Sequence, residues 1–216
     1  MQIKAILFDF DGTLANTVDL IIATFEHTCK AMLGSVPKRE DIVNTFGLPL
    51  GDAMLALSGR AELVEQMRDV YREYNNKHHD EMIKPIAGVQ ETLQALKAQG
   101  LKIAVVTSKK QPMVQRGIAC LQLGQYIDAV IALEDTTESK PHAEPMLAAC
   151  TKLGVLPQEC LCVGDSPFDL QSGRNAGAKT VAVRYTAFAL EKLLEEGKPD
   201  YVIAQLQELL ALVKRA

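Results

Sequence analysis

The chain lacks the features that mark several classes of protein. No apolar stretch approaches the length needed to cross a bilayer, and there is no internal repeat or low-complexity tract. The formal net charge of -4 over 216 residues argues against a broad nucleic-acid-binding surface. With 48% hydrophobic residues, the sequence predicts a globular protein whose ligand is neither a membrane nor a nucleic acid.

Cysteine usage excludes a disulfide framework. The cysteines are odd in number and scattered, and the Cys160-Leu161-Cys162 pair lies in a strand-like run without a second pair to complete a metal site. The chain starts directly with a strand-like segment and shows no signal-peptide pattern. We therefore expect reduced thiols and a cytoplasmic location. The cysteines are Cys29, Cys120, Cys150, Cys160 and Cys162.

Short apolar runs alternate with helical patterns, several of which end in glycine, as at Gly100 and Gly154. This alternation predicts an α/β fold with a Rossmann-like, doubly wound parallel sheet. The tail from Gln205 to Ala216 has the pattern of an amphipathic helix. The expected strands after the first cover residues 102–107, 129–133, 160–163, 180–183 and 201–203.

One region breaks the alternation. Between Asn16 and Met82 there is no convincing strand, but there are four segments with helical spacing. We expect an all-helical cap domain at 16–82, inserted into an α/β core domain at 1–15 and 83–216. The candidate hinges are residues 16–17 and 82–85.

The first strand ends in two carboxylates, Asp9 and Asp11, followed by Gly12 and Thr13. Because residues of equal parity share a face of an extended strand, we expect both side chains on one side. Their repulsion would be relieved by a hard cation such as Mg²⁺. Taken alone, the motif is also compatible with a solvated acidic turn.

Polar groups also follow three later strands, as Thr107 and Ser108, then Lys140, then Asp165 and Asp169. Each has an ordinary alternative, such as a helix N-cap, a surface lysine or a first-turn acid. In a parallel sheet, however, all of them emerge at one edge. Carboxylates, hydroxyls, backbone N–H groups and an ammonium together are what phosphoryl transfer requires.

With these motifs in place, the chain resembles phosphatases of the haloacid dehalogenase superfamily over essentially its whole length. The motifs are DFDGTLANT from Asp9, VVTS through Ser108, the Lys140-Pro141 pair and VGDSPFD around Asp165. The helical insert resembles the cap of the phosphoglycolate phosphatase and β-phosphoglucomutase branch. Its segments 45–50 and 71–81 are most similar to inorganic pyrophosphatases of the PpaX type.

The resemblance implies roles for the motif residues. Asp9 is the nucleophile that forms an aspartyl-phosphate, and Asp11 is the general acid and then the base. Mg²⁺ is the implied cofactor, held by Asp9, the backbone carbonyl of Asp11 and Asp165, with Asp169 as a further candidate. Lys140 neutralises charge and braces Asp9. The residues expected to bind the substrate phosphate are Gly12, Thr107, Ser108 and Lys140.

The substrate is less defined by the sequence. The expected partner is a small phosphorylated substrate or pyrophosphate, with phosphoglycolate as the second candidate substrate. The alternative function of another class is a sugar-phosphate mutase. The sequence leaves open whether the protein is a monomer or a homodimer. The apolar turn 47–50 is expected to project into the site and to favour a small leaving group. Cap cations could bind a second phosphate or simply form a solvated helix face. They are Lys38, Arg39, Arg60, Arg68, Arg72, Lys77, His78 and His79.

Overall fold

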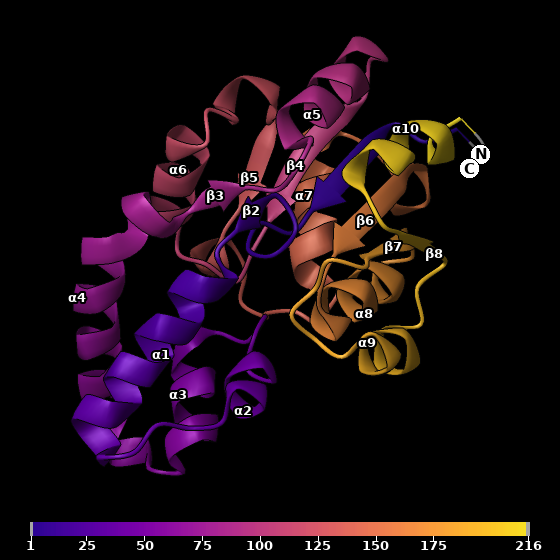
Figure 1. The fold of residues 1–216 in the computed structure, drawn as a ribbon. Coiled ribbons are helices and arrows are strands. Elements are labelled where there is room, and N and C mark those ends of the chain that lie inside the picture. Colours follow the sequence, from indigo (N-terminus) through magenta and orange to yellow (C-terminus); the bar gives the residue numbers. More distant parts are fainter. Residues whose placement is uncertain (1, 215–216) are drawn as a thin grey trace.

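A computed structural model describes residues 2–214. At its centre is a six-stranded parallel sheet in the order β5-β4-β1-β6-β7-β8 (Figure 1). This confirms the predicted parallel α/β sheet and the positions of its strands. The strands are β1 (Ala5–Phe8), β4 (Lys102–Val106), β5 (Ala129–Ile131), β6 (Cys160–Gly164), β7 (Lys179–Val183) and β8 (Tyr201–Ile203).

The central strands are apolar throughout because helices cover both faces of the sheet. Along β1, Ile6 and Phe8 belong to one hydrophobic cluster, whereas Ala5 and Leu7 belong to the cluster on the other face. The first face is covered by α5 (Val89–Ala98), α6 (Gln111–Cys120) and α10 (Leu209–Leu212). The second face is covered by α7 (Glu144–Leu153), α8 (Pro167–Asn175) and α9 (Leu190–Gly197).

Four helices between β1 and β4 form a cluster of their own (Figure 1). Residues Phe25, Met54 and Met67 lie in its hydrophobic centre, and none of them is more than 4% exposed. This agrees with the helical character expected for the segment, while the division into domains at residues 16 and 82 stays a prediction. The helices are α1 (Val18–Leu33), α2 (Arg39–Val43), α3 (Leu50–Ser58) and α4 (Val64–Met82).

A pair of short strands at the two ends of this segment was not predicted from the sequence. β2 (Ala15–Asn16) pairs antiparallel with β3 (Lys84–Pro85), so Asn16 lies opposite Lys84. Two residues are too few to give an alternating pattern, which explains why the pair was not expected. The pairing places the two candidate hinge segments side by side.

Some other boundaries differ from expectation. The predicted helix from Gln205 onward is a 3-10 turn (Leu206–Glu208) followed by α10, which ends at Leu212, and residues 215–216 lie outside the described residues. α6 and α9 were not predicted, and the third strand ends two residues early because a 3-10 turn (Leu133–Asp135) follows. Three more 3-10 turns cover Ala61–Leu63, Gly124–Tyr126 and Pro157–Glu159. Within residues 2–214, none of the helices combines the length and the apolar character of a membrane span.

Candidate active site

The loop after β1 is shaped by hydrogen bonds and by a glycine. The backbone N–H of Asp9 donates to the Val163 carbonyl at 2.9 Å, which holds the end of β1 against β6. Gly12 then adopts φ +86°, a left-handed conformation that favours glycine. A Cβ at Gly12 would also lie 2.4 Å from Oδ2 of Asp165. Glycine therefore allows the first and fourth motifs to approach each other closely.

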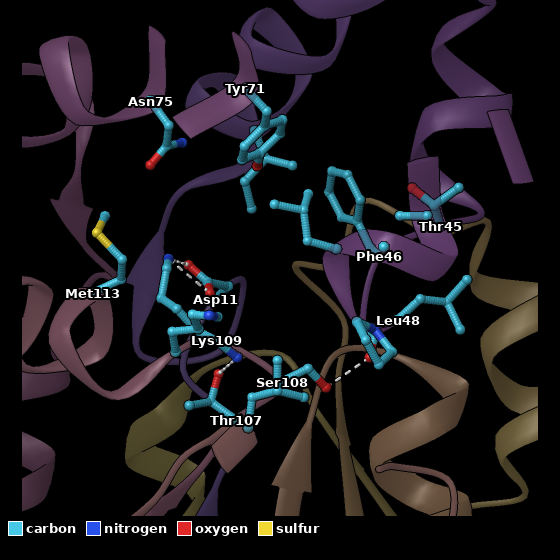
Figure 2. Close-up of a pocket in the computed structure, with 18 of the residues that line it drawn as sticks. Asp11, Thr45, Phe46, Leu48, Tyr71, Asn75, Thr107, Ser108, Lys109 and Met113 are labelled. Carbon is cyan, nitrogen blue, oxygen red and sulfur yellow. Dashed lines mark hydrogen bonds and ion pairs between the residues drawn. The ribbon is translucent and has the colours of Figure 1, made fainter. Parts of the chain in front are cut away.

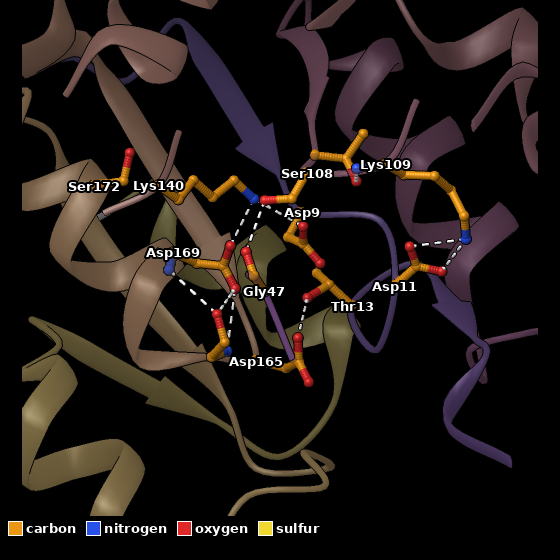
Figure 3. A network of polar contacts seen from close by, with 12 residues as sticks. Asp9, Asp11, Thr13, Gly47, Ser108, Lys109, Lys140, Asp165, Asp169 and Ser172 are labelled. Carbon is orange, nitrogen blue, oxygen red and sulfur yellow. Dashed lines mark hydrogen bonds and ion pairs between the residues drawn. The ribbon is translucent and has the colours of Figure 1, made fainter. Parts of the chain in front are cut away.

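Three buried carboxylates meet at the carboxyl edge of the sheet (Figure 3). Oxygens of Asp9, Asp165 and Asp169 all lie within 4.8 Å of one another. Lys140 joins two of them, because its Nζ donates to Oδ1 of Asp9 at 2.8 Å and to Oδ1 of Asp169 at 2.6 Å. Its side chain is only 2% exposed, which excludes the alternative of a solvated surface lysine and agrees with the expected contact between Lys140 and Asp9.

Asp169 has two roles in this arrangement. Its Oδ2 accepts hydrogen bonds from the backbone N–H and the hydroxyl of Ser166, at 3.1 and 2.6 Å, in a capping box at the start of α8. Its other carboxylate oxygen accepts from Lys140. The ordinary first-turn role and the place in the acidic cluster therefore coexist in one side chain.

The cluster is electrostatically suited to a divalent cation. Burial, together with the charge of Asp169, raises the pKa of Asp9 to about 7 despite the nearby Lys140. Burial and the charge of Asp9 raise the pKa of Asp165 well above its usual range. Burial alone would lower the pKa of Lys140, yet the carboxylates of Asp169 and Asp9 raise it. When all are ionised, three carboxylates and one ammonium leave two negative charges, and oxygen ligands of this kind suit Mg²⁺.

Asp11 lines the same cavity as Asp9 but is not part of the acidic cluster. Its carboxylate lies outside the acidic cluster and pairs with Nζ of Lys109 at 2.6 and 2.9 Å (Figure 3). Strand alternation does not explain this placement, because β1 ends at Phe8 and the chain has begun to turn before Asp11. A metal contact through the backbone carbonyl of Asp11 stays a prediction.

The second motif lies in the loop between β4 and α6. Thr107 is buried, and its Oγ1 accepts a hydrogen bond from the Lys109 backbone N–H at 3.1 Å. The hydroxyl of Ser108 donates to the carbonyl of Gly47 at 2.8 Å and so ties the core to the helical cluster. Since α6 begins at Gln111 with Lys110 as its N-cap, neither Thr107 nor Ser108 is that helix's N-cap.

A cavity of about 350 Å³ lies between the acidic cluster and the four helices (Figure 2). Its floor includes Asp9, Asp11 and the second motif, and the turn from Gly47 to Leu50 forms part of its wall, as expected. Of the eight cap cations considered, Arg68 and Arg72 line it. Gly12 and Lys140 lie behind the wall, in contact with Asp165 and Asp9 respectively.

Several wall residues were missed by the sequence analysis. Tyr71 and Asn75 line the cavity beside Arg68 and Arg72, all from α4 (Figure 2). Their spacing of three and four residues places them on one helix face, a signal that could have identified them. Lys109 directly follows the second motif, but only the structure shows that it pairs with Asp11.

Known proteins resemble this chain in sequence and in fold. Residues 6–183 match the family described as haloacid dehalogenase-like hydrolase. A protein of Clostridium perfringens is 46% identical to this chain over 99% of both chains. A protein of Bacillus mycoides, named pyrophosphatase PpaX, is 41% identical over 100% of this chain and 99% of its own.

Two solved structures share the fold. A haloacid dehalogenase-like family hydrolase of Streptococcus pneumoniae has a TM-score of 0.85 at 24% identity, covering 97% of this chain and 98% of that one. A hydrolase of Pseudomonas syringae has a TM-score of 0.87 at 23% identity, covering 98% of both.

The raised pKa of Asp9 makes stability depend on pH in the metal-free protein. The folded state keeps a proton up to a pKa of about 7, whereas the unfolded state loses it near 3.8. The free energy of unfolding, measured by urea denaturation with a chelator present, therefore falls as the pH rises from about 4 to about 7. In Asp9→Asn the free energy of unfolding should fall less over this pH range, and the remaining fall comes from Asp165, whose pKa is also raised. Equal slopes for the two proteins would contradict this interpretation of Asp9.

Proposed function

Because this chain belongs to the haloacid dehalogenase-like hydrolase family, we propose that it is a Mg²⁺-dependent phosphohydrolase that acts through an aspartyl-phosphate on Asp9. The observation that carries the proposal is the position of Asp9 at the cavity floor, paired with the buried Lys140 and beside Asp165 and Asp169. Such a carboxylate is fixed, partly neutralised and open to a substrate on one side.

In the first step, Asp9 attacks the phosphorus atom of the substrate. Lys140 occupies Oδ1 of Asp9, which leaves Oδ2 as the attacking oxygen. A bond forms between Oδ2 and phosphorus, and the bond between phosphorus and the leaving oxygen breaks. Asp11, at the cavity wall, gives a proton to that leaving oxygen. Thr107 and Ser108 line the cavity, and the Thr107 hydroxyl and the Ser108 backbone N–H would donate to the phosphoryl oxygens.

In the second step, water hydrolyses the aspartyl-phosphate. Asp11, now ionised, takes a proton from the water while the water oxygen forms a bond to phosphorus. The bond between phosphorus and Oδ2 of Asp9 then breaks. The products are inorganic phosphate and the regenerated carboxylate. When bound, Mg²⁺ would offset the negative charge of the carboxylates and the phosphoryl group, and Asp9, Asp165 and Asp169 would hold it.

We assign residues 16–82 the role of a cap over this chemistry. Residues of α1, α3 and α4 and of the turn before α3 line the cavity, and the paired hinge strands β2 and β3 form both connections to the core. Closure excludes bulk water, and opening admits substrate and releases product.

Pyrophosphate is the proposed substrate, supported by the PpaX name of the Bacillus mycoides relative. Arg68 and Arg72 give the cavity wall two guanidinium groups that suit an outer phosphate. 2-Phosphoglycolate is the second candidate, because its carboxylate could pair with the same arginines. A sugar-phosphate mutase is disfavoured, since the wall turn from Gly47 to Leu50 has no side chain that can hydrogen-bond sugar hydroxyls.

The nucleophile assignment is tested with Asp9→Asn. We expect this variant to lose phosphate release from pyrophosphate by at least about 10³-fold, because an amide oxygen is a poor nucleophile. Circular dichroism should show an unchanged fold. Asp19→Asn, on an exposed side chain of α1, is the matched control and should keep full activity. Full activity in Asp9→Asn would refute the proposal.

The role of the two arginines is tested by comparing substrates. Arg72→Ala and Arg68→Ala should each reduce kcat/KM for pyrophosphate by about 10-fold or more, the effect of losing a charge-assisted contact. The loss for methyl phosphate, which has no outer charge, should be much smaller. Arg60→Ala is the control, because Arg60 pairs with exposed Glu62 and lies outside the cavity wall. Equal losses for both substrates would exclude an outer-phosphate site at these arginines.

A further inference from the structure

The loop at residues 184–189, between β7 and α9, reaches from the core into the helical cluster. Phe188 is only 6% exposed and belongs to the same hydrophobic cluster as Phe25 and Met54. Its ring lies perpendicular to that of Phe46, with the centroids 6.4 Å apart. A core residue thus contributes to the hydrophobic centre of the helices that cover the cavity.

The same loop also holds the backbone of the acidic cluster. The hydroxyl of Thr186 donates to the carbonyl of Asp165 at 2.6 Å, and it accepts from the backbone N–H of Phe188 at 3.0 Å. Nearby, the hydroxyl of Tyr185 donates to the carbonyl of Thr13 at 3.2 Å. A single residue therefore separates Thr186, which contacts the backbone of a proposed metal ligand, from Phe188, the aromatic anchor in the helical cluster.

The cavity-wall turn from Gly47 to Leu50 also contacts residues of the core. Gly47 accepts from the Ser108 hydroxyl, and a Cβ at Gly47 would lie 3.0 Å from Cδ2 of Phe168. Its φ of +89° adds a second reason for glycine at this close approach. Lys192, at the start of α9, donates to Oδ1 of Asn44 at 2.6 Å. These contacts exist only while the helices lie over the cavity.

From these contacts we infer that Phe188 and Thr186 are positioning residues that couple closure of the helical cluster to the placement of Asp165. Moving the helices away would expose the Phe188 ring and free the backbone around Phe188. The position of the Thr186 hydroxyl, which accepts from the Phe188 backbone N–H, would then be less fixed. Coupling of this kind is reciprocal, so organising the Asp165 backbone also favours closure. The inference rests on the proposed function, because it requires a cap that opens.

The chain contains no tryptophan, which provides a direct optical test. Phe188→Trp introduces a single indole at the anchor. We expect its emission to shift to shorter wavelength when Mg²⁺ and imidodiphosphate, a non-hydrolysable analogue of pyrophosphate, are added together. Combining Phe188→Trp with Thr186→Val should weaken that response, whereas Thr186→Ser, which keeps a hydroxyl, should preserve it. Emission unaffected by the ligands would overturn the inference.

Kinetics and calorimetry give independent readouts. Phe188→Ala should raise the KM for pyrophosphate by about 10-fold with kcat changed much less, because closure then uses more of the binding energy. Phe188→Leu, which keeps an apolar anchor, should largely restore KM. Calorimetric titration with Mg²⁺ alone should show about 10-fold weaker binding to Thr186→Val than to the parent chain or to Thr186→Ser.

The outcomes separate the two proposals. Failure of the parent chain to release phosphate from pyrophosphate or phosphate esters would remove the proposed function. An active parent chain whose KM, Mg²⁺ affinity and indole emission are insensitive to these substitutions would leave the function intact. It would show that residues 186 and 188 only pack.

Discussion

The site depends on one buried ammonium. Nζ of Lys140 lies within 2.8 Å of oxygens on both Asp9 and Asp169, in surroundings where an unpaired charge would be costly. Removing it would leave three buried carboxylates without a cationic side chain in contact with them among the described residues. The sheet makes this contact possible, because parallel β1, β5 and β6 end at one edge and the segments that follow them carry Asp9, Lys140 and Asp169 to one point. The nearby Gly12 allows the loops to approach without a clash.

Two halves of the molecule divide the work of the proposed enzyme. The core supplies the nucleophile, the acidic cluster and the second motif, all on loops anchored by buried strands. The helical cluster supplies the opposite wall, where α4 presents Arg68, Tyr71, Arg72 and Asn75 on one face. In the proposed enzyme, the core would therefore carry out the chemistry, and the side chains of α4 would select the substrate. Asp11 and Lys109 lie between the two halves and face the cavity.

Sequence patterns predicted what is local or follows from topology. The strands and the convergence of four motifs could be inferred because apolar runs are buried on two sides and parallel strands share an edge. The Asp11–Lys109 pair, the anchor at Phe188 and the β2–β3 pair could not. Each joins residues at least 60 positions apart, and nothing in the spacing of either partner indicates the other. The contact of Asp11 with Lys109 could not follow from strand alternation, because Asp11 lies past the end of β1.

The central claim is that Asp9 takes the phosphoryl group while Lys140 holds its other oxygen. A crystal structure with Mg²⁺ and beryllium fluoride, which mimics a phosphoryl group on a carboxylate, tests it most directly. We expect the adduct on Oδ2 of Asp9, with Oδ1 still in contact with Lys140 and the cation beside Asp165. An adduct on any other side chain, or beryllium fluoride bound in the cavity without a bond to Asp9, would contradict it.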